Sequence, residues 1–285
     1  MLFVFGDAFV DAGNRPPTSQ ATATASATGR FSDGLVQSDY LARMLGYDES
    51  PPAYRLVPAD EVDPSGVNFA MSGAGVAPSA AGETPLATQI DQFRRLVRHG
   101  IVDDDDLDNS VALIGLSGIH DYSGLSIVSS DDEDVTEKMA NGVKRLLDLG
   151  VSKILVNTAP PMGCHPYRTW LSNYRQCDSQ VDRISSIHNE ALKKRMDGWE
   201  DVLILDVDPI FRDLVQSMGY APCCDATSKP EGYCGQQDAQ GNALYTVCRN
   251  PEDFFYWDYV HPSQAGWHAS MDRLQRPIMD FLGIY

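Results

Sequence analysis

Near its carboxyl end the chain has a segment, Trp257-Asp258-Tyr259-Val260-His261-Pro262-Ser263, whose residue types suit proton transfer. Asp258 stands three residues before His261, a spacing at which a carboxylate can hold the Nδ1–H of an imidazole. The ring's Nε2 is then free to take a proton from a nucleophile. The spacing is frequent by chance, so its weight depends on other segments that would complete a catalytic site.

The opposite end of the chain has a strand-to-turn segment that presents Ala8. A strand is expected at Leu2 to Phe5, and the turn Gly6-Asp7-Ala8 follows it. The methyl group of Ala8 cannot itself attack a carbonyl, whatever base stands beside it. The backbone N–H of Ala8, near the start of the next helix, can still stabilise an anion.

Two further segments are candidates for binding the substrate. The glycines of Gly66 to Gly75 would let backbone amides approach it closely, although a turn with packing duties only is the alternative. His120, in Leu116 to Tyr122, follows an expected strand and could donate a hydrogen bond to an oxyanion. A loop histidine with a structural partner is the alternative for His120.

Strands and helices alternate along the chain, which predicts an α/β sandwich with a mostly parallel sheet. Continuous apolar runs predict strands that are covered on both faces, at 2–5, 111–114, 153–157 and 202–205. Apolar residues at helical spacing predict helices at 35–45, 135–149, 179–196, 211–218 and 263–281, with Ser263 as an N-cap. In such sheets ligands bind at the carboxyl ends of the strands.

The composition bounds the class of protein. The 285 residues are 43% hydrophobic, enough for one core, and we expect a single domain over 1–285. A net charge of −18 argues against nucleic acid and anionic lipid as partners. No run approaches the ~20 apolar residues of a membrane span. The acidic runs at 103–106 and 131–134 are expected to be solvated loops rather than metal sites, and the Ala/Thr/Ser-rich residues 18–28 a mobile loop.

The cysteines lie in loop-like sequence of the second half, and their even number favours disulfides and a secretory compartment. Cys164 and Cys177 flank one short loop and are expected to pair. Cys223 and Cys224 are expected to pair with Cys234 and Cys248, in an order that the sequence leaves open. Zinc is the rival, but the usual spaced ligand pairs are missing. We expect no metal and no cofactor.

Together the four segments resemble the four signature blocks of the GDSL, or SGNH, hydrolases, most closely of the plant-type branch. Gly29-Arg30-Phe31-Ser32-Asp33-Gly34 and Pro160-Pro161-Met162-Gly163-Cys164 are similar to plant family segments. The resemblance implies a three-layer α/β/α, flavodoxin-like fold. It also implies that Ala8 occupies the nucleophile's place, that Asp258 and His261 are acid and base, and that the oxyanion donors are Ala8 N–H, Gly73 N–H and His120.

The sequence departs from this family pattern twice. Ala8 replaces the serine, and His120 stands where the family has an asparagine. A Ser→Ala replacement made to trap substrate is expected, because Asp258 and His261 persist. Natural loss of the serine is the alternative, which the divergence at His120 favours. Ser72 and Ser117 lie in the right blocks, but the family uses neither as a nucleophile.

The expected reaction is the hydrolysis of a carboxylic ester. A secreted polysaccharide O-acetylesterase, acting on a plant cell-wall glycan such as xylan, is preferred over an acyl-lipid or small-metabolite esterase or acyltransferase. The sequence has no long apolar lid, and four aromatic residues near the blocks could stack on sugars or belong to the core: Phe9, Phe31, Tyr122 and Trp257. A binding module without activity is the non-enzyme alternative. No signal peptide is visible, as in a processed secreted chain or an intracellular one; the oligomeric state is left open.

Overall fold

A parallel five-stranded sheet forms the centre of the molecule, in the order β2-β1-β3-β4-β5. The computed structural model describes residues 1–15, 29–58, 60–76, 83–122, 131–229 and 232–284, without the side chains of 131–134, so the expected loop at 18–28 lies outside it. The strands are β1 (Leu2–Gly6), β2 (Gly66–Asn68), β3 (Val111–Gly115), β4 (Lys153–Asn157) and β5 (Val202–Leu205). All four expected strands are therefore present, and β2 is an addition.

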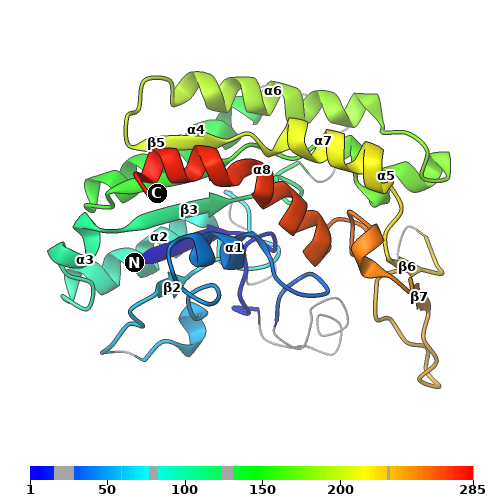
Figure 1. Ribbon diagram of the computed structural model, residues 1–285, viewed down its shortest axis with the longest axis horizontal. Coiled ribbons are helices and arrows are strands. Elements are labelled where there is room, and N and C mark those ends of the chain that lie inside the picture. The colour runs from blue at the N-terminus through cyan, green and yellow to red at the C-terminus, as the bar shows by residue number, and fades with distance from the viewer. Residues whose placement is uncertain (16–28, 59, 77–82, 123–130, 230–231, 285) are drawn as a thin grey trace.

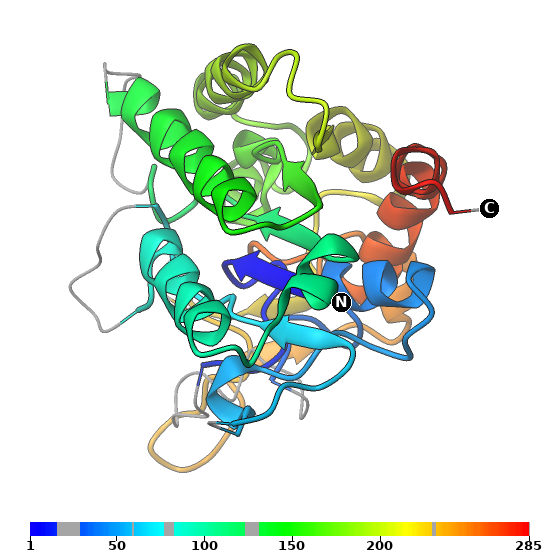
Figure 2. The same cartoon turned by 90° about the vertical axis from the view of Figure 1, so that its left-hand side faces the viewer.

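Helices cover both faces of the sheet, which confirms the three-layer α/β/α sandwich (Figures 1 and 2). One face packs against α1 (Gln37–Met44), α7 (Val207–Met218) and α8 (Gln264–Leu282). The other face packs against α2 (Leu86–Arg98), α4 (Asp131–Asp148) and α6 (Ser179–Arg195). Successive strand residues alternate between the two cores: Leu2 and Val4 belong to the first, and Phe3 and Phe5 to the second. The continuous apolar runs follow from this double burial.

The cap of α8 is the expected one, whereas α7 begins earlier than expected. Ser263 caps α8 as expected, since its Oγ accepts the N–H of Gly266 at 2.9 Å. Helix α7 begins at Val207, four residues before the expected start. Pro209 lies in its first turn, where a missing N–H leaves no hydrogen bond unmade.

Short elements complete the chain around the ends of the sheet. They are α3 (Asp104–Asp108), α5 (Pro166–Thr169) and four 3₁₀ turns, η1 (Tyr54–Leu56), η2 (Met162–Cys164), η3 (Trp170–Ser172) and η4 (Pro251–Asp253). The acidic run at 103–106 is thus the start of α3, which Asp103 caps by accepting the N–H of Asp106. The run at 131–134 begins α4 rather than forming a loop.

A two-stranded antiparallel hairpin, β6 (Cys224–Ala226) and β7 (Tyr245–Val247), stands apart from the central sheet. In Figure 1 it lies at the right-hand end of the molecule, with α5 near it, while the N-terminus and the start of β1 lie to the left. Strand β1 runs toward the hairpin's end of the molecule, so the carboxyl edge of the parallel sheet faces that end.

Candidate active site

Asp258 and His261 form a tight pair in the loop before α8. The ring Nδ1 of His261 lies 2.8 Å from Oδ2 and 2.9 Å from Oδ1 of Asp258. Oδ1 also accepts the backbone N–H groups of Val260 and His261, at 2.9 and 2.8 Å. A carboxylate held in this way accepts from an Nδ1–H, which leaves Nε2 as the nitrogen that can take a proton.

Each member of the pair favours the charged form of the other. Burial by itself would lower the pKa of His261, but the charge of Asp258 and its hydrogen bond to the ring raise the pKa above its usual value. Burial would raise the pKa of Asp258, but the imidazole and two backbone N–H groups hold it below its usual range. The pair is therefore arranged to stabilise an imidazolium that forms when the ring accepts a proton.

The Ala8 turn follows β1 and is fixed by the buried carboxylate of Asp7. Its Oδ1 accepts the N–H of Phe9 at 3.1 Å, and its Oδ2 accepts both the N–H and the hydroxyl of Ser117, at 2.7 and 2.5 Å. Asp7 thereby ties the turn to the segment after β3. Burial raises the pKa of Asp7 in spite of these donors.

Asp11, one turn further along, ties the same segment to Gly66–Gly75. Its Oδ1 accepts the N–H groups of Gly13 and Asn14 at 2.7 Å each, and its Oδ2 accepts that of Ser72 at 2.8 Å. The amide of Asn14 donates to the carbonyls of Asn68 and Ala70. Asp7, Asp11 and Asn14 are not among the site residues predicted from the sequence. The sequence feature that could have indicated them is a series of polar residues at intervals of three or four directly after the first strand.

The two ends of the chain meet at His261. The ring centroids of His261 and Phe9, the residue after Ala8, are 6.3 Å apart. Asp7, the residue before Ala8, is close enough for its charge to help raise the pKa of His261. Ala8, which lies between Asp7 and Phe9 in the sequence, is buried, with 6% of its surface exposed. The turn that contains Ala8 therefore lies next to the imidazole.

Gly73 and His120 lie in segments that approach each other. Gly73 has a φ of +85°, a left-handed conformation that favours glycine. A Cβ added to the nearby Gly75 would lie 2.8 Å from Cδ2 of His120, so the glycine lets the two segments come together. The half-buried His120 thus lies beside the segment that contains Gly73.

Neither alternative serine is arranged as a nucleophile. The hydroxyl of Ser117 donates to Asp7, and Ser117 is 4% exposed. Ser72 is also buried, and its backbone is held by Asp11 and by Arg15, which donates to its carbonyl at 2.9 Å. Both serines are therefore buried and belong to segments that hydrogen bonds fix within the fold.

Three of the four aromatic residues considered for sugar stacking belong to the core. Phe9 packs edge-on against Trp267, with ring centroids 5.4 Å apart, and Phe31 is buried beside His261 at 5.2 Å. The hydroxyl of Tyr122 lies 2.7 Å from Nδ1 of the buried His188. Trp257 alone of the four keeps a partly exposed side chain.

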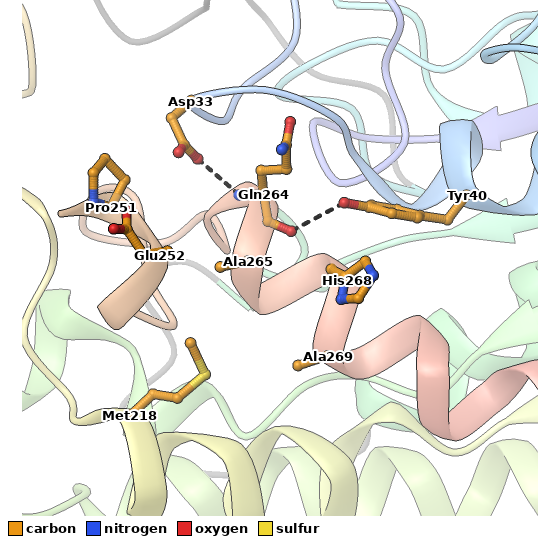
Figure 3. A pocket seen from close by; sticks show the side chains of 9 residues that line it. All are labelled: Asp33, Tyr40, Met218, Pro251, Glu252, Gln264, Ala265, His268 and Ala269. Atoms are coloured by element: carbon orange, nitrogen blue, oxygen red, sulfur yellow. Dashed lines mark hydrogen bonds between the residues drawn. The ribbon is translucent and has the colours of Figure 1, made fainter.

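The segment that carries Phe31 is fastened to the first turn of α8. Asp33 accepts the N–H of Gln264 at 2.7 Å, and the hydroxyl of Tyr40 donates to the carbonyl of Gln264 at 3.2 Å (Figure 3). The hydroxyl of Ser32 donates to the carbonyl of Pro262. A pocket of about 530 Å³ opens here, but its lining includes neither Ala8 nor the Asp258–His261 pair: Asp33, Tyr40, Met218, Pro251, Glu252, Gln264, Ala265, His268 and Ala269.

The cysteines form three disulfides and leave no free thiol: Cys164–Cys177, Cys223–Cys248 and Cys224–Cys234. The order of the last two pairs, open from the sequence, is thereby given. In the described part of the chain, one group has the proximity of a metal site, Cys164, Cys177 and Asp182. Its two sulfurs are bonded to each other, so they are not thiolate ligands. No described helix has the length and apolar character needed to cross a membrane.

Comparison with known proteins places the chain in a family. The model of the GDSL-like lipase/acylhydrolases matches residues 2–274. The chain belongs to this family. It is 31% identical to the GDSL esterase/lipase At5g03600 of Arabidopsis thaliana, over 99% of this chain and 95% of that protein. It is 33% identical to At2g36325 of the same plant, also a GDSL esterase/lipase, over 94% of this chain and 84% of that protein.

The GDSL chain also has a distant likeness to a solved structure, a catalytic mutant of Axe2, an acetylxylan esterase from Geobacillus stearothermophilus. The TM-score is 0.45 at 15% identity, over the whole of this chain and 94% of that one. Family membership, however, makes the protein an ester hydrolase by class, whose substrate bears an ester.

Proposed function

We propose that Asp258 and His261 are the acid and base of this GDSL hydrolase and that Ala8 occupies the position of its nucleophilic serine. The observation that carries the proposal is the contact of the Asp258-bound imidazole with the turn that presents residue 8. The ring centroid of His261 stands 6.3 Å from that of Phe9, the residue after Ala8. A base that is already oriented by a buried carboxylate needs only a hydroxyl beside it.

The reaction of the serine form follows from these groups. The residue-8 hydroxyl attacks the ester carbonyl while Nε2 of His261 takes its proton. The N–H groups of residue 8 and Gly73, with His120, hold the oxyanion. The tetrahedral intermediate then expels the alcohol, which receives the proton from His261. Water, deprotonated by the same ring, attacks the acyl-enzyme, and the ring then returns the proton to the departing serine oxygen as the acid is released.

The Ala8 form is proposed to be inactive or nearly so. Its methyl group can form no acyl-enzyme, and loss of the nucleophile from a comparable triad lowers kcat by about 10⁶-fold. The Ala8→Ser variant should therefore hydrolyse p-nitrophenyl acetate, whereas the Ala8→Ser/His261→Ala double variant should not. If a folded Ala8→Ser protein gave no turnover above buffer, the assignment of the site would be wrong.

We further propose that the substrate is an O-acetylated cell-wall polysaccharide such as xylan, met outside the cell or in the secretory pathway. Three disulfides support an oxidising compartment, and the charge of −18 favours a neutral glycan over an anionic surface. The Ala8→Ser variant should release acetate from acetylated xylan faster than it cleaves long-chain p-nitrophenyl esters. Preference for the long chains would favour an acyl-lipid esterase instead.

The retained pair near the Ala8 turn also supports a second candidate, a natural binding module without the chemistry. A source gene that encodes alanine at position 8, together with tight glycan binding by the protein, would favour this candidate. A serine codon at that position would favour a deliberate replacement.

A further inference from the structure

Two disulfide-containing segments, one at Cys223–Cys224 and one between Cys164 and Cys177, donate backbone hydrogen bonds to the loop that contains Asp258 and His261. The N–H groups of Cys223 and Cys224 donate to the carbonyls of Tyr256 and Trp257, at 2.9 and 2.7 Å. These carbonyls belong to the two residues directly before Asp258. The two donors lie at the start of the β6–β7 hairpin, which is seen at the right-hand end of Figure 1.

Tyr259, between Asp258 and His261, is held at both its main chain and its side chain. Its carbonyl accepts the N–H of Tyr167 in α5 at 3.0 Å. Its hydroxyl donates to Oδ1 of Asp225 at 3.1 Å and lies 3.2 Å from the carbonyl of Ala226, both in β6. Because Asp258 folds back to accept the N–H groups of Val260 and His261, any rotation of Tyr259 would displace both members of the pair.

Asp225 collects donors from three separate segments. Besides Tyr259, the hydroxyl of Tyr174 donates to its Oδ1 at 2.9 Å, and Nζ of Lys229 lies 2.8 Å from its Oδ2. The ammonium of Lys229 also stands over the ring of Tyr174, 4.9 Å from the centroid. Burial and the charge of Asp225 hold the pKa of Tyr259 and of Tyr174 well above their usual values, so both hydroxyls keep their protons.

We propose that Asp225 is a positioning residue of the esterase, which acts through Tyr259 to hold the Asp258–His261 pair in its hydrogen-bonded geometry. This inference rests on the proposed function. A hydrogen bond to a charged acceptor is shorter and stronger than one between neutral groups, so the carboxylate is a firm anchor for a loop without regular structure. Catalysis is sensitive to such anchoring, since a displacement of 1 Å can lower the rate by about 10²-fold.

The first test uses the protein with Ala8 and follows the proton on Nδ1 of His261 by NMR. Asp225→Ala and Tyr259→Phe remove the same hydrogen bond from its two ends. Each should abolish the downfield Nδ1–H resonance or broaden it by faster exchange with water. Each should also lower the pKa of His261 by about one unit, because the ring loses part of its contact with Asp258. The double variant should show little further change.

Asp238→Ala is the matched control. Asp238 lies in the connection between β6 and β7 and accepts from Asn242 at 2.8 Å, and none of its hydrogen bonds reaches the catalytic loop. It should leave the resonance and the pKa unchanged. If it had the same effect as Asp225→Ala, the cause would be general loosening of the hairpin and the proposal would fail. Unchanged resonances in folded Tyr259→Phe would also overturn it.

The second test adds Ala8→Ser and measures turnover of p-nitrophenyl acetate. Asp225→Ala and Tyr259→Phe should lower kcat by about 10-fold with little change in KM, because they misplace the base rather than remove a binding contact. A change confined to KM would contradict a positioning role. If the Ala8→Ser protein were itself inactive while the NMR changes occurred as expected, the esterase proposal would fail and the structural coupling would stand.

Discussion

At the scale of single residues, the candidate site depends on buried carboxylates that accept hydrogen bonds from the protein itself. Asp258 holds the imidazole of His261, while Asp7 and Asp11 hold the backbone that surrounds it. Each carboxylate accepts at least three hydrogen bonds, which offset part of the cost of removing its charge from water; for Asp7 and Asp11 burial still raises the pKa. The hydrogen bonds of these carboxylates hold the imidazole and the surrounding backbone in place, and the proposed function requires in addition a hydroxyl at position 8.

The raised pKa of His261 gives a direct prediction for pH dependence. A general base must be neutral to accept a proton, so kcat/KM of the Ala8→Ser variant should rise with pH, with a midpoint above ~6.5, the usual value for histidine. Adding Asp258→Asn should move the midpoint down and lower kcat by about 10⁴-fold. The measurement is a pH–rate profile with p-nitrophenyl acetate. A midpoint below that of free histidine would contradict the assigned pair.

At the scale of elements, the segment from Arg30 to α1 joins the two ends of the chain. Ser38, in α1, donates to the carbonyl of Val10 beside the Ala8 turn, at 3.0 Å. Ser32 and Asp33, before α1, contact Pro262 and Gln264 beside His261. A single connecting segment therefore contacts both the Ala8 turn and the loop of His261, which in the proposed function carry the nucleophile's position and the base.

The buried ion pair of Arg30 and Asp39 anchors this connecting segment, so its removal should be costly. The carboxylate of Asp39 accepts hydrogen bonds from Nε–H and Nη2–H of Arg30, at 2.8 and 2.6 Å. It also accepts the backbone N–H groups of Val36 and Ser50. Asp39→Ala leaves a buried guanidinium without its main partner and should lower the free energy of unfolding by about 3–5 kcal/mol. Urea denaturation measures this loss.

Asp33→Ala is the comparison for that measurement, because it removes a hydrogen bond at the exposed first turn of α8. It should cost about 1 kcal/mol. Equal and small losses for the two variants would show that the Arg30–Asp39 pair does not anchor the segment.

At the scale of the whole molecule, burial favours the neutral form of two histidines. Burial lowers the pKa of His165 to about 3 and that of His188 to about 4. Each binds a proton in the unfolded chain below ~6.5 but not in the folded one, so each makes the fold less stable as the pH falls through that range. His261 has the opposite effect, because its raised pKa adds stability that is present below ~6.5 and lost above its folded pKa.

A variant isolates one of these contributions. His188→Gln should reduce the stability lost between pH 7 and pH 5 by about 2 kcal/mol, since the titrating group is gone. His268→Gln is the control, because the side chain of His268 is 63% exposed. Urea titrations of both variants at the two pH values give the comparison. Identical pH dependence for the two would mean that His188 is protonated in the folded protein.

The sequence by itself determined the strands that are buried on both faces, because a continuous apolar run has few other places in a folded protein. It also determined the Asp258–His261 pair and the Ser263 cap, which depend on residues three apart. The amphipathic spacing of Leu86, Ile90 and Phe93 was available as well and predicts α2, although no helix was assigned there. These are local patterns, and local geometry alone makes them possible.

Only the tertiary structure decided what depends on distant partners. Strand β2 has three residues, including Gly66 and Asn68, and forms because β1 offers it hydrogen bonds. Phe9 and Phe31 belong to the core because other elements cover them, which their aromatic type does not reveal. The pairing of Cys223 with Cys248, and the contact of Asp225 with Tyr259, join segments whose separation along the chain says nothing about their distance in space.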